Sequence, residues 1–211
     1  MTTGLRELKK RQTRQAVSDT ATRLFLERGF EAVTIAEIAA AARVAKMTVT
    51  NYFPRKEDLA LDFHEAFRGS LAAALESRAE GESALTALRR EYLEAVARKD
   101  ALAGFSGPEF ARMITGSPTL AARLRELHQQ REDALAEALA AETGVSADTL
   151  APRAAAALLA AAHRTLFHRA LDLTLAGRTN RQVAGVLTKE ADEVFALLEP
   201  SLAGYAVREA A

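Results

Sequence analysis

Apolar residues recur along most of the chain at the three- to four-residue spacing of amphipathic helices. Near the start, Ala16, Thr20 and Leu24 share one face with the pair Ala21–Phe25, which predicts a helix from about residue 8 to residue 28. Gly29 follows, and glycine is typical of the left-handed position that ends a helix. Two shorter helices are then expected, one from residue 34 and one over residues 46–52.

The helical pattern continues beyond residue 56, and no strand-like alternation interrupts it. One long helix is expected from Lys56 to about Gly81, because Leu59, Phe63 and Phe67 follow a single stripe. Residues 201–211 are expected to fray. Further helices are predicted over residues 83–99, 109–115, 118–143 and 152–176, with a last one capped by Asn180 and ending before Pro200.

The strongest local signals lie between residues 33 and 59. Thr34-Ile-Ala-Glu37 forms a capping box, and Val33 and Ile38 stand where a hydrophobic staple would join them. Pro54 cannot continue the helix before it. Two short helices joined by a tight turn have the geometry of a helix-turn-helix. The pattern therefore predicts an all-α protein with a helix-turn-helix domain of three helices over residues 1–54 and a larger helical domain over residues 55–211.

A helix that reads DNA must be short and carry few large obstructions on its outer face. Val44 and Val49 are the apolar residues that would anchor the second short helix. Thr50 offers a methyl group for thymine and Asn51 an amide for adenine. Lys46 has the reach for guanine or a phosphate, and Tyr52 and Lys56 lie where phosphates should pass. The expected outer positions of this helix are Lys46, Met47, Thr48, Thr50 and Asn51.

Residues 11–63 resemble the DNA-binding domain of TetR-family transcriptional regulators. The resemblance rests on Leu24-Phe25, Gly29-Phe30, the Thr34 cap, Val44, Lys46, Thr48-Val49, Tyr52-Phe53 and Lys56-Glu57-Asp58-Leu59. It implies that Thr34, Tyr52 and Lys56 contact phosphates, and that Lys46, Met47, Thr50 and Asn51 face bases.

The chain departs from the family pattern at four positions. Arg43 replaces the turn glycine, which costs about 1 kcal/mol if the residue must adopt a positive φ, although its side chain could contact a phosphate. Ala45 replaces the capping serine, Met47 stands where glycine is common, and Thr50 stands where tyrosine is common. These changes affect the expected operator sequence more than the fold.

Charge is uneven in a chain whose net charge is zero. Residues 1–60 hold eleven basic and seven acidic residues, a net charge of +4, as expected of a polyanion-binding head. A solvated basic helix face is the alternative explanation. The chain has no cysteine, which rules out disulfides and thiol catalysis and fits a cytoplasmic location. A basic, polar start and a longest apolar run of nine residues predict neither a secretory signal nor a membrane span.

The last two long helices are apolar on more than one side, and such helices need two partners. We expect a homodimer built from these two helices, as the family resemblance also implies, with a monomeric bundle as the alternative. Polar or aromatic residues that interrupt apolar stripes are the candidates for a pocket that binds a small-molecule effector. They are Phe105, Phe110, Met113, His128, Arg131, His163 and Phe167. Arg131 is expected to point inward or to lie at the rim of a pocket, and an internal cation would favour a ligand with a carboxylate, phosphate or acyl-thioester head.

Together these features predict a repressor that binds a palindromic double-stranded DNA operator as a homodimer and is released by a small ligand. One alternative is a DNA-binding protein that has no ligand response and acts constitutively or architecturally. An enzyme is the other, although the chain has no metal-binding His-Glu-x-x-His, no phosphate-binding glycine loop and no nucleophile-elbow serine motif. No cofactor, metal site or membrane association is expected.

Overall fold

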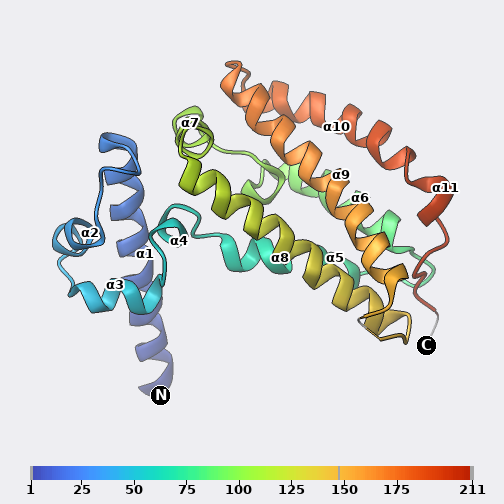
Figure 1. Ribbon diagram of the computed structural model, residues 1–211, viewed down its shortest axis with the longest axis horizontal. Coiled ribbons are helices and arrows are strands. Elements are labelled where there is room, and N and C mark those ends of the chain that lie inside the picture. The colour runs from blue at the N-terminus through green and yellow to red at the C-terminus, as the bar shows by residue number, and fades with distance from the viewer. Residues whose placement is uncertain (1, 147, 210–211) are drawn as a thin grey trace. The chain divides into compact units, whose positions relative to one another are not determined.

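The computed structural model describes residues 2–146 and 148–209, and in these residues all regular structure is helical. The first four helices are α1 (Thr2–Arg28), α2 (Ile35–Ala41), α3 (Lys46–Tyr52) and α4 (Lys56–Ala60) (Figure 1). The remaining elements are α5 (His64–Glu76), α6 (Ala84–Arg98), the 3₁₀ turn η1 (Ala101–Ala103), α7 (Pro108–Gly116), α8 (Pro118–Glu142), α9 (Leu150–Leu175), α10 (Asn180–Ala196) and α11 (Glu199–Leu202). The predicted all-α class is confirmed.

Contacts divide the chain into two compact units. Unit 1 holds the described residues up to His64 together with Arg112–Leu124, and unit 2 holds Glu65–Ala111 and the described residues from Arg125 onward. Helix α8 is therefore shared, since its first turns belong to unit 1 and its remainder to unit 2. The compact units do not divide at residue 54, where the sequence placed the domain boundary.

Unit 1 is built around α1, which packs against α2, α3 and α4. Its core is apolar and closed: Val17, Ala21, Val33, Ile38, Val49, Phe53 and Leu59 are fully or almost fully buried. Phe25 meets Phe30 with their ring centroids 5.0 Å apart. Burial of a large apolar side chain contributes about 1.5–3 kcal/mol, so these side chains fix how the three short helices are held on α1.

The helix predicted from Lys56 to Gly81 is two helices, and this prediction was wrong. Helix α4 ends at Ala60, Leu61 leaves helical geometry with φ −109° and ψ 54°, and α5 begins at His64. The cause is tertiary: the hydroxyl of Ser18 donates to the Asp62 carboxylate at 2.5 Å, and Arg14 donates to the Asp62 carbonyl at 3.2 Å. These bonds to α1 hold the chain in a bend that its helical periodicity does not show.

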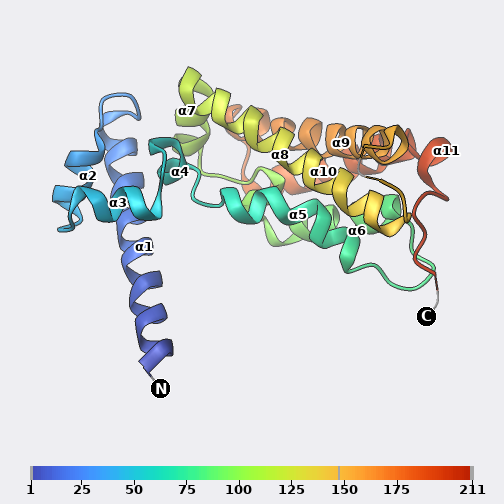
Figure 2. The same ribbon diagram turned by 60° about the horizontal axis from the view of Figure 1, so that its bottom comes forward.

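In unit 2, α9 and α10 lie side by side, and α6 packs against both (Figure 1, Figure 2). η1 comes close to α9: a Cβ added at Gly104, whose φ is +93°, would lie 2.7 Å from the carbonyl oxygen of Phe167. Only glycine fits this approach. The core of unit 2 is continuous across α5, α6, α8, α9 and α10.

Two predictions near the C-terminus need correction. Thr179, not Asn180, is the N-cap of α10, because its side chain accepts from the Gln182 amide while Gln182 bonds back to the Thr179 backbone. The tail predicted to fray over residues 201–211 is ordered as far as residue 209: it contains the end of α11, and Arg208 exchanges backbone hydrogen bonds with Gly81 and Glu82. Residues 210–211 lie outside the described residues.

Candidate functional site

The turn between α2 and α3 is set by hydrogen bonds at both ends of α2. The capping box starts the helix, since the hydroxyl of Thr34 accepts from the Glu37 amide at 3.2 Å and the Glu37 carboxylate accepts from the Thr34 amide at 2.8 Å. At the other end, the amide of Arg43 donates to Ala40 and that of Val44 to Ala39, which is a Schellman motif. Arg43 occupies the left-handed position with φ 55°.

Helix α3 is fixed by its inner face and exposed on its outer face. Val49 and the following Phe53 are fully buried, whereas Met47 is 69% exposed. Lys46 and Asn51 are also exposed, and Thr48, Thr50 and Tyr52 are half-buried. Among the described residues, no side chain caps the start of α3 at Ala45, as expected from the missing serine. The structure thus brings most of the predicted reading residues to one short, well-anchored helix.

The hydroxyls of the two candidate threonines are already engaged. Thr50 donates to the Met47 carbonyl at 3.1 Å, which leaves its methyl group as the free part of the side chain. Thr34 donates to the Glu37 carboxylate at 2.8 Å, so a phosphate must share or replace that bond. Hydrogen bonds from Thr34, led by its backbone amide, and from Arg28 lower the pKa of Glu37 to about 2, and the carboxylate is ionised when the box forms.

Lys56 has a role that the sequence did not reveal. Its ammonium donates to the carbonyls of Phe30 at 2.9 Å, Val33 at 3.1 Å and Glu31 at 3.5 Å. It also lies 4.2 Å from the centroid of the Phe30 ring. These contacts engage the ammonium group for which the family resemblance implies a phosphate contact. They favour a supporting role for Lys56 in holding the loop between α1 and α2.

The segment Arg112–Leu124 is tied to the rest of unit 1 by two polar contacts. The Ser117 hydroxyl, at the start of α8, donates to Glu31 at 2.6 Å and lowers the pKa of that carboxyl. Arg123 donates twice to one oxygen of the Asp58 carboxylate, at 2.8 and 3.0 Å, and both side chains are largely buried. Neither contact was predicted from the sequence.

Unit 2 contains a buried arginine, Arg131, which points inward as predicted. Its guanidinium lies 4.5 Å from the centroid of the Phe67 ring, and the residue is 5% exposed. No hydrogen bond or ion pair of Arg131 occurs within residues 2–146 and 148–209. Burial lowers its pKa to about 9, which leaves it charged near neutral pH.

Two buried histidines flank this arginine among aromatic rings. His128 makes edge contacts with Phe67 and Phe167, at centroid distances of 5.0 and 5.2 Å. His163 makes similar contacts with Tyr92 and Phe195, both at 5.4 Å. Burial, followed by repulsion from Arg131, lowers the pKa of His128 to about 3 and lowers that of His163 as well. Both imidazoles are therefore neutral at pH 7.

Four polar atoms of this group have no hydrogen-bond partner among the described residues: Tyr92 Oη, His128 Nε2, His163 Nε2 and Arg131 Nε. We call Tyr92, His128, Arg131 and His163, with the rings of Phe67, Phe167 and Phe195, the interior cluster. It contains four of the predicted ligand residues. Phe105 is buried in the core of the same unit, Phe110 is half-buried there, and Met113 belongs to unit 1.

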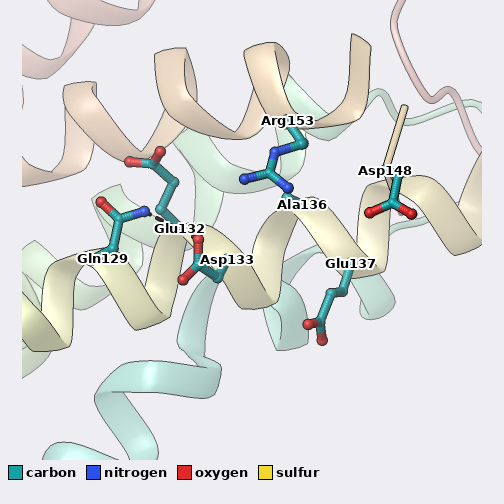
Figure 3. A pocket seen from close by; sticks show the side chains of 7 residues that line it. All are labelled: Gln129, Glu132, Asp133, Ala136, Glu137, Asp148 and Arg153. Carbon is teal, nitrogen blue, oxygen red and sulfur yellow. Dashed lines mark hydrogen bonds between the residues drawn. The ribbon is translucent and has the colours of Figure 1, made fainter. Parts of the chain in front are cut away.

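A separate pocket of about 370 Å³ opens between α8 and the start of α9 (Figure 3). The side chains of Glu132, Asp133, Glu137 and Asp148 give it four carboxylates against the single guanidinium of Arg153. No group of three or more metal-ligating side chains able to hold an ion occurs in the described part of the chain. None of the described helices is both long enough and apolar enough to span a bilayer.

Comparison with known proteins identifies the N-terminal segment. Residues 18–63 match the family described as bacterial regulatory proteins, tetR family. The HTH-type transcriptional regulator TcmR of Streptomyces glaucescens is 34% identical over 150 residues, which are 69% of this chain and 66% of that protein. The chain belongs to the TetR family. It thus spans just under two thirds of the length of this curated relative.

Solved structures show that the TetR-family fold extends over 88–95% of the chain. NalD of Pseudomonas aeruginosa, described as the secondary repressor of a multidrug efflux pump, has a TM-score of 0.53 and 21% identity over 88% of this chain and 96% of its own. A putative TetR-family regulator from Syntrophomonas wolfei has a TM-score of 0.56 and 18% identity, with the same coverage. A complex of SmeT with triclosan has a TM-score of 0.55 and 16% identity over 95% and 96% of the two chains.

The residues that match the family model, 18–63, include the helix-turn-helix formed by α2 and α3. The named relatives are regulators, not enzymes. Sequence reasoning did not find Tyr92, Phe67 or Phe195, because an aromatic residue on an apolar helix face gives no local sign that its ring borders a buried charge. Arg131 was found since a charge within an apolar stripe is such a sign.

Proposed function

We propose that this TetR-family protein is a repressor that binds a palindromic operator as a homodimer and is released by a small-molecule ligand. The observation that carries the proposal is the outer face of α3, where Lys46, Met47 and Asn51 are exposed while Val49 is fully buried. A short helix held from one side and bare on the other fits the major groove.

The side chains divide into two roles. Lys46, Met47, Thr50 and Asn51 face base edges, with the Asn51 amide on adenine and the Thr50 methyl on thymine. Thr48 is half-buried at the edge of this surface. Phosphates are contacted by Arg43 and Tyr52, and by Thr34 if it releases its bond to Glu37. The phosphate contacts position the protein on the duplex, and the base contacts select the sequence.

The homodimer forms through α9 and α10. Ala154, Leu158, Ala161 and Thr165 follow one another at helical spacing on the outer side of α9, and Leu158 is 45% exposed. On α10 and just beyond it, Val186, Val194 and Leu198 are only half-buried and Leu197 is 79% exposed. The other apolar stripes of these helices are buried within the subunit. A symmetric partner that presents the same residues would cover those left outside.

Two operator half-sites about 34–36 Å apart require the two recognition helices to stand at a matching separation. A ligand bound in unit 2 would favour the conformation with the wrong separation. Helix α8 is suited to couple ligand binding to DNA release. Ser117, just before it, bonds to Glu31 and Arg123 bonds to Asp58, while His128 and Arg131 lie further along the same helix. SmeT, a protein with this fold, was solved with a small aromatic ligand.

The test begins with selection of bound fragments from the source genome, followed by mobility-shift titration of a recovered fragment. We expect Lys46→Ala and Asn51→Ala to weaken binding, and Lys46→Ala also to flatten its salt dependence. Unchanged affinity in both variants would rule out α3 as the reading helix. A protein that binds the fragment but is stabilised by no compound of a metabolite library in a thermal-shift screen would be the constitutive alternative.

A further inference from the structure

We propose that the effector is an apolar organic acid whose carboxylate pairs with Arg131 inside the interior cluster. This inference rests on the proposed ligand response and names the chemical class of the ligand. It depends on the contrast between two buried arginines of unit 2, and on the kinds of groups that surround one of them.

Arg78 shows how this fold treats a buried arginine that serves structure. The residue is 3% exposed, yet its guanidinium donates to the Ala206 carbonyl at 2.7 Å and forms an ion pair with Glu142. Arg131 is buried to the same degree, and in the described residues it has neither contact. A buried cation that has no hydrogen bond or ion pair, and only the face of the Phe67 ring beside it, is costly, so a position that keeps one serves something other than stability.

The groups beside Arg131 are neutral donors, not anions. The Tyr92 hydroxyl and the Nε2 atoms of His128 and His163 lack partners in the part of the chain that the structure describes. Burial raises the pKa of Tyr92 and lowers those of both histidines, so none of the three carries charge at pH 7. Glu190 also raises the pKa of Tyr92, but its carboxylate is held by Arg169 at 2.9–3.1 Å.

A carboxylate supplies what this group lacks. Its two oxygens match the paired donors of a guanidinium, and they can accept further bonds from a phenol and from a neutral imidazole. The other members of the interior cluster are the rings of Phe67, Phe167 and Phe195, which are almost completely buried and offer only apolar contact. The rest of the ligand is therefore apolar, and ring systems would add edge contacts.

The open pocket beside α9 favours a different charge. Its four carboxylates outnumber its one arginine, so the pocket as a whole repels an organic anion (Figure 3). Charge therefore assigns the acid to the interior cluster and not to that pocket.

The experiment uses full-length protein and three matched pairs of probes: benzoate, 2-naphthoate and diphenylacetate, each with its primary amide. Affinities are measured by calorimetry, and naphthoate binding also by fluorescence, since the chain has no tryptophan to interfere. We expect at least one acid to bind about tenfold to a hundredfold more tightly than its amide, the range for a charged hydrogen-bonded contact. In Arg131→Met that ratio should fall to about one, while Arg131→Lys should keep part of it.

The control is Arg78→Met, which removes a buried but paired arginine. We expect it to lower the melting temperature and to leave the ratio of acid to amide affinity unchanged, whereas Arg131→Met should raise the melting temperature. The proposal is overturned if no acid binds better than its amide, or if Arg131→Met keeps the wild-type ratio. Failure of the proposed function is separate: it appears as absence of operator binding by the ligand-free protein, whatever the probes do.

Discussion

Replacing Arg43 by glycine should make the protein more stable and its DNA binding weaker. Arg43 holds φ 55° at the C′ position after α2. A left-handed conformation costs a non-glycine residue about 1–2 kcal/mol, and Arg43→Gly removes this cost. Glycine also makes the unfolded chain more flexible, which lowers the gain in stability by about 0.4–1 kcal/mol. Arg43→Gly should therefore stabilise the protein by about 0.5–1 kcal/mol, or about 1–4 °C in melting temperature.

The same change removes a cation that we place on a phosphate. Each neutralised phosphate contributes about 0.9 to the slope of log affinity against log salt, so a dimer that loses two contacts should lose about 1.8 from that slope. Fluorescence anisotropy with a labelled operator at four or five salt concentrations gives the slope. Thermal and urea unfolding of the same preparations give the stability.

Lys99→Gly is the matched control, because Lys99 also has a left-handed φ, 57°, at the end of α6 in unit 2. It should stabilise the protein by a similar amount and leave the salt slope untouched. An Arg43→Gly protein that binds DNA with the wild-type slope would remove Arg43 from the interface. One that is less stable than the wild type would mean that the arginine side chain makes a stabilising contact that outweighs its backbone strain.

Three further outcomes are expected. Lys56→Met should lower the free energy of unfolding by about 2–3 kcal/mol, because the ammonium's bonds to three carbonyls are lost. In the same denaturation assay Lys46→Met, at an exposed position, should change it by less than about 0.5 kcal/mol. Equal effects of the two substitutions would contradict the supporting role of Lys56. Because the folded state keeps the His128 pKa near 3 and the unfolded chain has one near 6.5, the unfolded chain binds more protons between these values, and stability falls as pH drops. From pH 7 to pH 5 this loss should be about 2 kcal/mol for His128, and His128→Phe should lose correspondingly less in urea titrations at the two pH values. Leu158→Glu should shift the sedimentation-velocity profile toward monomer, while Val145→Glu, at 43% exposure against 45%, should not; a dimer that survives Leu158→Glu would place the interface elsewhere.

Local signals predicted unit 1 well because most of its boundaries are set within a few residues. The capping box of Thr34 and Glu37, Gly29 at the end of α1 and Pro54 after α3 are all local features, and α3 has the predicted bounds. The break between α4 and α5 was missed, since it depends on Asp62 meeting Ser18 across 44 residues. The bonds of Lys56 to the carbonyls of Phe30, Glu31 and Val33 were missed for the same reason, since they also join residues more than twenty positions apart.

The interior cluster was predictable only in part. A charged or polar residue within an apolar stripe is visible in the sequence, and this is how Arg131, His128 and His163 were found. Tyr92 lies on a different helix, α6, and only the packing of α6 against α9 and α10 brings its ring to His163. Whether a buried arginine has a partner is also invisible, since Arg78 finds Glu142 at a distance of 64 residues and Arg131 finds none among the described residues.

Energetics limit what the pairing with Arg131 can accomplish in the proposed switch. Moving a two-state equilibrium from 1:99 to 99:1 requires about 5.5 kcal/mol of differential affinity. One charged hydrogen-bonded contact supplies about 1.5–3 kcal/mol, and only if it forms better in the released state than in the DNA-bound state. The apolar body of the acid must therefore contribute a comparable share through its contacts with the aromatic rings. Arg131 and Arg123 both belong to α8, so a ligand that favours one arrangement of α8 around Arg131 also acts on the helix that carries the bond to Asp58. On this view the acid head selects the ligand, the apolar body supplies the remaining free energy, and α8 is the element whose two arrangements the ligand must distinguish.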